Sequence, residues 1–272
     1  MSDCRIFCMA NNKGGVAKTA TTTSLATLLG LAGHRILVVD FDPQANATQG
    51  LGCYENGKPD IFDVMLNGKL VSEALVHSQY KVDVLVNMKN TSRPLDAFRQ
   101  QKKESLVLLR DLLEPLKDSY DEIFIDTNPA ANLLSDMAMV AADYVLIPVK
   151  QDSSSIDGIF DELQTIKYLK ENYNSKLEIK GIFLANVNSR TNLVKVRLDQ
   201  YTQAFGNQFK SVAIREDNTY SMANANLQPI YYYQKKSNVG NDYIDLAQQL
   251  GLLSLREYEK LDADGYVKHT EG

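Results

Sequence analysis

The chain has 272 residues, 44% of them hydrophobic and 23% charged, a composition ordinary for a globular protein of one large domain or two small ones. No apolar stretch approaches the roughly 20 residues that span a bilayer, and the N-terminus lacks the basic and apolar regions of a signal peptide. Its three cysteines form no CxxC pair, which argues against a disulfide framework or a zinc site, so we expect a cytoplasmic protein. The net charge of −5 means that any nucleic-acid contact requires a local basic patch.

Short apolar runs alternate with longer segments of helical periodicity, which is the pattern of parallel strands joined by helices. We expect strands at 6–10, 36–40, 82–86, 123–126, 144–149 and 179–187, and helices at 19–31, 94–116, 133–141, 156–172, 193–205 and 243–253. The sequence therefore predicts one doubly wound, mostly parallel α/β domain over 1–272. Its core is expected at about 5–253, followed by a polar tail at 254–272. Because the first strand starts near residue 5, we expect no N-terminal helix-turn-helix domain.

A glycine-bearing segment with two lysines follows the first predicted strand and reads Lys13-Gly14-Gly15-Val16-Ala17-Lys18-Thr19. A loop between a strand and a helix directs backbone N–H groups and the positive end of the helix dipole at an anion. Lys18 would neutralise the outer phosphates of a nucleotide, and the Thr19 hydroxyl would coordinate Mg²⁺. The two glycines let the backbone approach the phosphates without a Cβ in the way.

The loop departs from the phosphate-loop pattern GxxxxGK[ST], because Asn12 and Ala17 occupy its two glycine positions. The alternative to a nucleotide site is a tight strand-to-helix turn with incidental lysines. At Ala17 we expect a negative φ, at the opening of the helix.

Two carboxylates follow predicted strands at the edge where a nucleotide would bind. Asp42 comes after the strand at 36–40 and Asp126 ends the strand at 123–126, and the carboxyl ends of neighbouring parallel strands converge on the ligand crevice. We expect Asp42 to orient or deprotonate the attacking water, and Asp126 to hold Mg²⁺ through a water or through Thr19. The alternatives are an Asp-Pro turn and a structural aspartate at a strand end.

The segment KGGVAKT resembles the deviant Walker A motif, KGGxGK[ST], of the ParA/Soj/MinD group of P-loop ATPases, and the run from Asp40 to Asn46 resembles that group's DxDPQxN motif. The resemblance covers residue 5 to about 253, and it implies ATP and Mg²⁺ as cofactors. In that group the first lysine, here Lys13, reaches across a nucleotide-sandwich dimer to the partner's ATP. The resemblance thus implies catalytic roles for Lys13, Asp42 and Lys18. It implies nucleotide contacts from Lys13, Gly14, Gly15, Val16, Ala17, Lys18, Thr19 and Ala20.

The later part of the chain resembles Soj-like partition proteins in the run from Ser189 to Leu193. We interpret Asn186, at a strand end, as the residue that contacts adenine, although a plain strand-terminal asparagine is the alternative. The resemblance implies non-specific DNA contact at Arg190. Further DNA contacts are expected from Lys195, Arg197, Lys235 and Lys236, with solvated helix charges as the alternative. A basic residue and a glutamate of the Soj pattern are replaced here by Thr219 and Met222. The run Tyr231–Tyr233 is expected to pack at a strand.

The resemblance implies an ATPase of a plasmid or chromosome partition system, located in the cytoplasm on the nucleoid. Its partners would be a second copy of the chain, duplex DNA and a small centromere-binding protein. A MinD-like membrane-cycling ATPase is the alternative, but the acidic segment 255–265 does not resemble the basic amphipathic helix that this requires, so no membrane partner is expected. An iron–sulfur reductase would need cysteines after Cys53, and the chain has none.

Overall fold

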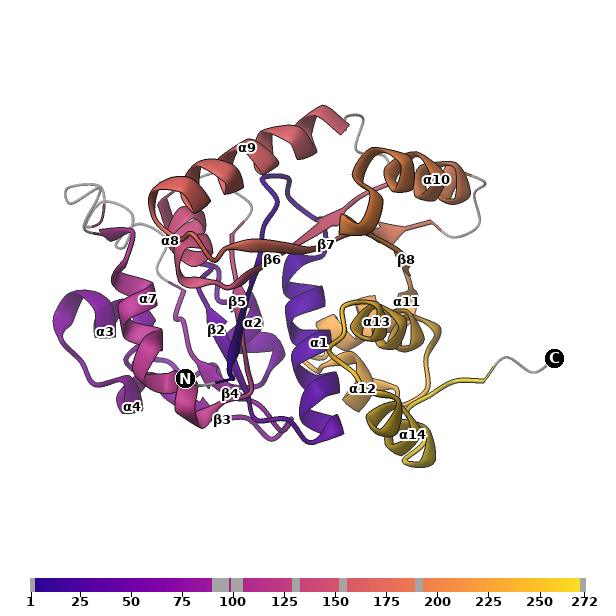
Figure 1. The fold of residues 1–272 in the computed structure, drawn as a ribbon. Helices are drawn as coiled ribbons and strands as arrows, with labels where there is room; N and C mark the ends of the chain where they lie inside the picture. Colours follow the sequence, from indigo (N-terminus) through magenta and orange to yellow (C-terminus); the bar gives the residue numbers. More distant parts are fainter. Residues whose placement is uncertain are drawn as a thin grey trace.

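The computed structural model describes residues 3–89, 98, 105–128, 133–151, 156–188 and 193–269. Within them an eight-stranded sheet has the order β3-β4-β2-β5-β1-β6-β7-β8, and only the β3–β4 pair is antiparallel (Figure 1). The strands are β1 Arg5–Met9, β2 Ile36–Asp40, β3 Leu75–His77, β4 Asp83–Leu85, β5 Glu122–Asp126, β6 Tyr144–Val149, β7 Glu178–Val187 and β8 Phe209–Arg215. All five residues of β2 and of β5 are buried, because helices cover both faces of the sheet.

Each face of the sheet packs against its own helical layer (Figure 1). One layer contains α1 Lys18–Ala32, α2 Asn46–Gly50, α11 Asn218–Ala225, α12 Ile230–Tyr233, α13 Asn238–Gln249 and α14 Leu255–Ala263. The other contains α3 Ile61–Asn67, α4 Val71–Ala74, α7 Leu108–Leu113, α8 Leu133–Ala141, α9 Ile156–Asn172 and α10 Leu193–Phe205, and short 3₁₀ turns occur at Glu114–Ser119 and Gly206–Gln208. None of the helices in these described ranges is both long and apolar enough to cross a membrane.

The predicted doubly wound fold is confirmed, and the predicted strands lie within one residue of those observed. Two strands were not predicted. β3 is a three-residue antiparallel edge strand, and β8 is only half-buried, so its apolar residues alternate with polar ones. Within the helix predicted at 94–116, Leu108–Leu113 form α7, and a 3₁₀ turn follows from Glu114.

The predicted polar tail is wrong for its first half, because Leu255–Ala263 form the helix α14. Ser254 and Glu257 make a capping box at its start, and Leu261 is fully buried against the rest of the domain. The expectation that the tyrosine run packs at a strand is also wrong: Ile230–Tyr233 form α12. Tyr231 is buried there, and its hydroxyl donates to the Gly240 carbonyl at 2.8 Å.

Candidate nucleotide site

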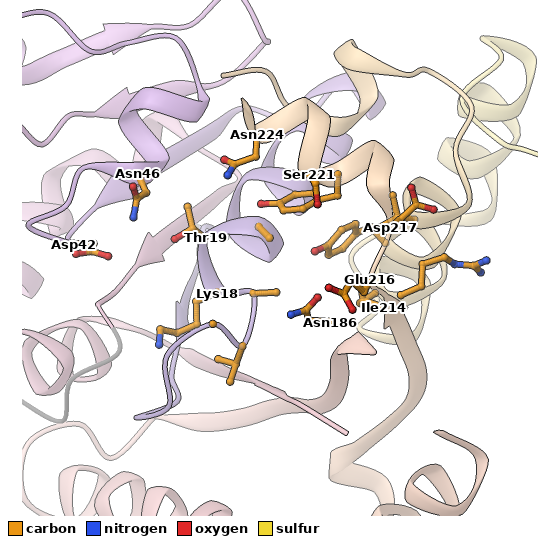
Figure 2. Close-up of a pocket in the computed structure, with 18 of the residues that line it drawn as sticks. Lys18, Thr19, Asp42, Asn46, Asn186, Ile214, Glu216, Asp217, Ser221 and Asn224 are labelled. Carbon is orange, nitrogen blue, oxygen red and sulfur yellow. The ribbon is translucent and has the colours of Figure 1, made fainter. Parts of the chain in front are cut away.

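A cleft of about 520 Å³ opens where the carboxyl ends of the central strands meet the start of α1, a size in the range of small-molecule sites. Figure 2 shows two groups of side chains in it. Lys18, Thr19 and Asp42 lie on one side, and Asn186 and Glu216 lie on the other. The structure therefore brings together residues from the loop, the first acidic motif and the end of β7, as the sequence predicts.

The side chain of Lys18 occupies the centre of the phosphate loop. It is buried, and its Nζ donates to the Asn11 carbonyl at 2.7 Å. Asn11 is itself fixed, because its Nδ2 donates to the Pro148 carbonyl at 2.8 Å. Burial lowers the pKa of Lys18, and Asp126 opposes that shift most among the nearby carboxylates. The lysine therefore lies inside the loop, bonded to a backbone carbonyl that phosphate oxygens can replace.

The prediction of a negative φ at Ala17 is wrong. Ala17 is the N-cap of α1 with φ 65° and ψ 31°, in the left-handed region, and Gly15 in the same loop has φ 68°. The loop has to reverse direction within the one residue before Lys18 so that the helix N–H groups face the cleft. Glycine adopts this conformation freely, whereas a residue with a Cβ is strained there by roughly 1–2 kcal/mol.

Asp126 and Asp40 lie side by side, because they are paired in register on the adjacent strands β5 and β2. Asp40 accepts hydrogen bonds from the Thr48 N–H and hydroxyl, each at 2.7 Å, and burial raises its pKa to about 7. Asp126 is also fully buried and accepts a hydrogen bond from the Thr22 hydroxyl at 3.4 Å. Its pKa is raised by burial and by Asp40, while nearby Thr19 acts in the opposite direction. Among the residues that the structure describes, the Oδ2 of Asp126 has no hydrogen-bond partner.

This oxygen set fits a divalent cation. Mg²⁺ prefers one or two carboxylates together with hydroxyl, water and phosphate oxygens. Thr19 and Asp126 supply the hydroxyl and the unpaired carboxylate oxygen, and a cation would remove the electrostatic cost of the buried acids.

Asp42 is held in a turn at the mouth of the cleft. One carboxylate oxygen accepts from the Gln44 N–H at 3.0 Å, and the Asp42 carbonyl accepts from Asn87 Nδ2 at 2.7 Å. Burial raises the pKa of the carboxyl, and Lys18 lowers it. The Asp-Pro turn, which was the alternative to a role for Asp42 in hydrolysis, is therefore present. It places the Asp42 carboxylate in the lining of the cleft.

The far end of the cleft contains the predicted Asn186 together with residues that no motif marked. Asn186 has a left-handed φ of 54°, which asparagine tolerates better than most residues. Opposite it, the turn after β8 and the start of α11 add Glu216, Asp217 and Tyr220. Asp217 caps α11 by accepting from the Thr219 N–H at 2.7 Å. The alternation of apolar and polar residues in β8 is the sequence signal that could have predicted the strand leading to Glu216, Asp217 and Tyr220.

Two further charged residues contact the loop and were missed. A Cβ placed on Gly15 would lie 3.3 Å from Lys150 Nζ, so this lysine covers the glycine from the end of β6. Glu162, on α9, is buried, and burial raises the pKa of its carboxyl while the nearby Asn12 backbone lowers it. Both come from elements distant in sequence, so loop motifs alone could not identify them.

The residues predicted to contact DNA do not form one surface. Lys195 is exposed on α10, whereas Arg197 is occupied by the Gln151 carbonyl at 3.1 Å. Lys235 lies over the Tyr266 ring at 4.5 Å, with Lys236 beside it between α12 and α13, in the helical layer on the other face of the sheet from α10. Arg190 lies outside the described residues.

Comparison with known proteins agrees with this geometry. The family model described as an AAA domain matches residues 4–179. The chromosome partitioning protein ParA of Myxococcus xanthus is 34% identical, over 90% of this chain and 87% of that protein. The sporulation initiation inhibitor protein Soj of Bacillus subtilis is 30% identical, over 90% of this chain and 98% of the relative. The chain belongs to the ParA/Soj family of ATPases. The resemblance to the ParA/Soj/MinD group that the lysine loop indicated is thus confirmed.

Solved structures share the fold of this ParA/Soj-family chain. McdA from Cyanothece, solved as an ATP complex, has a TM-score of 0.80 at 20% identity, over 94% of this chain and 99% of that one. Cobyrinic acid a,c-diamide synthase from Mycobacterium smegmatis, solved with ADP and magnesium, has a TM-score of 0.78 at 24% identity, over 94% and 96% of the two chains. The MinD of Pyrococcus horikoshii has a TM-score of 0.73 at 22% identity, over 93% and 98%.

Proposed function

We propose that this protein is the ATPase of a DNA-partition system, which binds ATP with Mg²⁺, dimerises around the nucleotides and holds duplex DNA without sequence preference. Hydrolysis, stimulated by a centromere-binding partner, would end that state. The observation that carries the proposal is the pair of lysines in the loop. Lys18 is buried in the protein's own cleft, while Lys13 is exposed at the front of the loop.

In this proposal the chain's own residues position the nucleotide. Lys18 exchanges the Asn11 carbonyl for phosphate oxygens, and the backbone N–H groups at the start of α1 bind the same phosphates. Thr19 and Asp126 would hold Mg²⁺, which supplies charge neutralisation on the transferred phosphoryl group. Asp42 orients the attacking water, and Asn186 contacts the base.

Lys13 is not among the residues that line the cleft containing Lys18. Its backbone N–H donates to Asn11 Oδ1 at 2.8 Å, and among the described residues its side chain has no hydrogen bond or ion pair. A second copy facing the cleft would receive this ammonium on its own phosphates. A cation delivered in this way acts as an arginine finger does, by stabilising charge in the transition state.

DNA binding is assigned to the α10 side of the molecule. Lys195 is exposed there and Arg190 precedes the same helix, whereas Lys235 and Lys236 lie elsewhere and Arg197 is occupied by protein contacts. The chain carries a net charge of −5, so a single patch binds weakly. Two patches joined in a dimer make DNA binding depend on ATP.

The experiment that tests the proposal measures binding of the purified protein to arbitrary duplex DNA with ATP, with ADP and without nucleotide. We expect the protein to bind DNA only in the presence of ATP, and this binding should weaken as the salt concentration is raised. The Lys195→Glu variant should weaken it about tenfold, whereas Lys235→Glu, the same charge change on the other face of the sheet, should not.

A MinD-like membrane-cycling ATPase would give a different result. Anionic vesicles would then retain the ATP-bound protein and DNA would not. No described feature favours that second function, because α14 turns Leu261 into the core and leaves only Leu255 as a large exposed apolar residue on that helix.

A further inference from the structure

The strand β7 contains a bulge at Asn186, where it reaches the cleft. The pairing of β7 with β8 shifts register between Ala185 and Val187, so Asn186 is an extra residue between them. Ala185 packs in the layer that contains α1 and Val187 in the opposite layer, although residues two apart in a regular strand face the same side. The bulge and the left-handed φ of 54° thus direct Asn186 into the cleft lining, and bulges beside active sites commonly redirect a side chain in this way.

Glu216 lies just beyond the end of the neighbouring strand β8, next to this bulge. Its backbone N–H donates to the Val187 carbonyl at 2.8 Å, which places it beside the residue that follows Asn186. Both side chains line the cleft, and Figure 2 shows them together at the end away from Lys18. Glu216 is exposed and Asn186 is half-buried. Two polar side chains from adjacent strand ends therefore lie where the proposed function places the base.

The residues on either side of Glu216 make contacts that hold the fold together. Arg215 donates from two of its guanidinium nitrogens to the Asp242 carboxylate on α13, each at 2.7 Å. Asp217 is the N-cap of α11, where its side chain accepts a backbone N–H at 2.7 Å. Among the described residues, the side chains of Asn186 and Glu216 have no hydrogen-bond partner and no ion pair. The fold therefore accounts for the neighbours of Glu216 but not for its own carboxylate.

We propose that Glu216 selects the base of the nucleotide: its carboxylate accepts a hydrogen bond from the 6-amino group of adenine and disfavours a purine with a 6-oxo group. The inference rests on the proposed placement of the nucleotide, with the phosphates at Lys18 and the base at Asn186. A carboxylate only accepts hydrogen bonds, whereas the Asn186 amide both donates and accepts. Asn186 can therefore pair with either base, but a 6-oxo oxygen facing Glu216 brings two acceptors together. Selection between the two bases thus depends on Glu216.

Nucleoside diphosphates test this selection without hydrolysis or dimerisation. ADP carries a 6-amino group on its purine, and IDP carries a 6-oxo group at the same position. Isothermal titration calorimetry of the full chain with Mg²⁺ measures the dissociation constant of each. Solvent reaches Glu216 and compensates part of the lost hydrogen bond, so we expect ADP to bind about tenfold more tightly than IDP, less than a buried site achieves.

Matched variants separate the hydrogen bond from the charge. Glu216→Gln keeps the size of the side chain but adds a donor, so it can face a 6-oxo oxygen without conflict. The preference for ADP should then fall to about twofold or less, with IDP bound more tightly than by the wild-type protein. Asp217→Asn is the control, because it removes the same charge at the adjacent position of the cleft and asparagine also caps a helix. Its preference for ADP should stay at the wild-type value.

The outcomes distinguish this inference from the proposed function. If neither diphosphate binds the wild-type protein, the nucleotide site is wrong and the role of Glu216 is wrong with it. If ADP binds but IDP binds equally or more tightly, the site stands and Glu216 does not select the amino group. The inference is also wrong if Glu216→Gln keeps the wild-type preference, or if Asp217→Asn loses it to the same extent, because the effect would then come from charge alone.

Discussion

At the scale of single residues, the phosphate loop combines strain with burial. Ala17 has a left-handed backbone that glycine would adopt without strain, and Asp126 keeps a buried oxygen without a partner. Both features are costs in the free protein. A bound cation would offset the cost at Asp126, while the strain at Ala17 remains in either state.

Replacing Ala17 by glycine should therefore stabilise the protein. We expect Ala17→Gly to raise the free energy of unfolding by about 1 kcal/mol, because glycine has no Cβ to be strained in the left-handed conformation. Urea denaturation measures the change. The control is Ala204→Gly on the exposed surface of α10, where φ is not positive and glycine should lower stability by about 0.5–1 kcal/mol. A loss of stability in both variants would contradict the strain at Ala17.

At the scale of secondary-structure elements, those with a strong hydrophobic pattern could be predicted from the sequence. The strands bearing the lysine loop, Asp42 and Asp126 are buried on both faces and read as continuous apolar runs, so the phosphate half of the cleft could be predicted. β8 and α11 could not, because their half-buried faces mix polar and apolar residues. As a result, Glu216, Asp217 and Tyr220 at the other end of the cleft were missed.

The helix α14 was missed for a related reason: it is mostly polar, and long-range contacts hold it in place. His34, just beyond the end of α1, lies between Glu122 of β5 and Glu257 of α14, with both nitrogen–oxygen distances 2.9 Å. Lys260 Nζ also donates to the Ala32 carbonyl at 3.0 Å. α14 is thus fastened to the end of the helix that begins at the phosphate loop.

The His34 contacts predict a pH dependence of stability. Hydrogen bonds to Glu122 and Glu257 raise the pKa of His34 from 6.5 to about 9, while Arg5 also pairs with Glu122. A raised histidine pKa stabilises the folded state below pH 6.5, and this contribution is lost as pH rises from about 6.5 to 9. We expect a loss on the order of 1–3 kcal/mol over that range. His34→Gln should remove that dependence in urea denaturation, and an unchanged pH profile in the variant would contradict it.

At the scale of the whole molecule, the exposed groups of the nucleotide face suit a second copy. The cleft, Lys13 and the front of the loop open on the same side, where the carboxyl ends of the strands lie. DNA contact at α10, away from the layer that contains α14, would then be presented twice by a dimer (Figure 1). In the proposed function, the molecule acts as a switch whose two states are monomer and dimer.

The most direct test of that switch is the mass of the Asp42→Ala variant in solution, measured by sedimentation velocity with ATP and Mg²⁺, with ADP and without nucleotide. Removing Asp42 should slow hydrolysis while leaving Lys18 and Thr19 to bind the nucleotide, so the ATP-bound state persists during the measurement. We predict a dimer with ATP and a monomer in the other two conditions, and a second substitution, Lys18→Ala, should abolish the dimer. A mass that stays the same in all three conditions, while ATP is bound, would contradict the account.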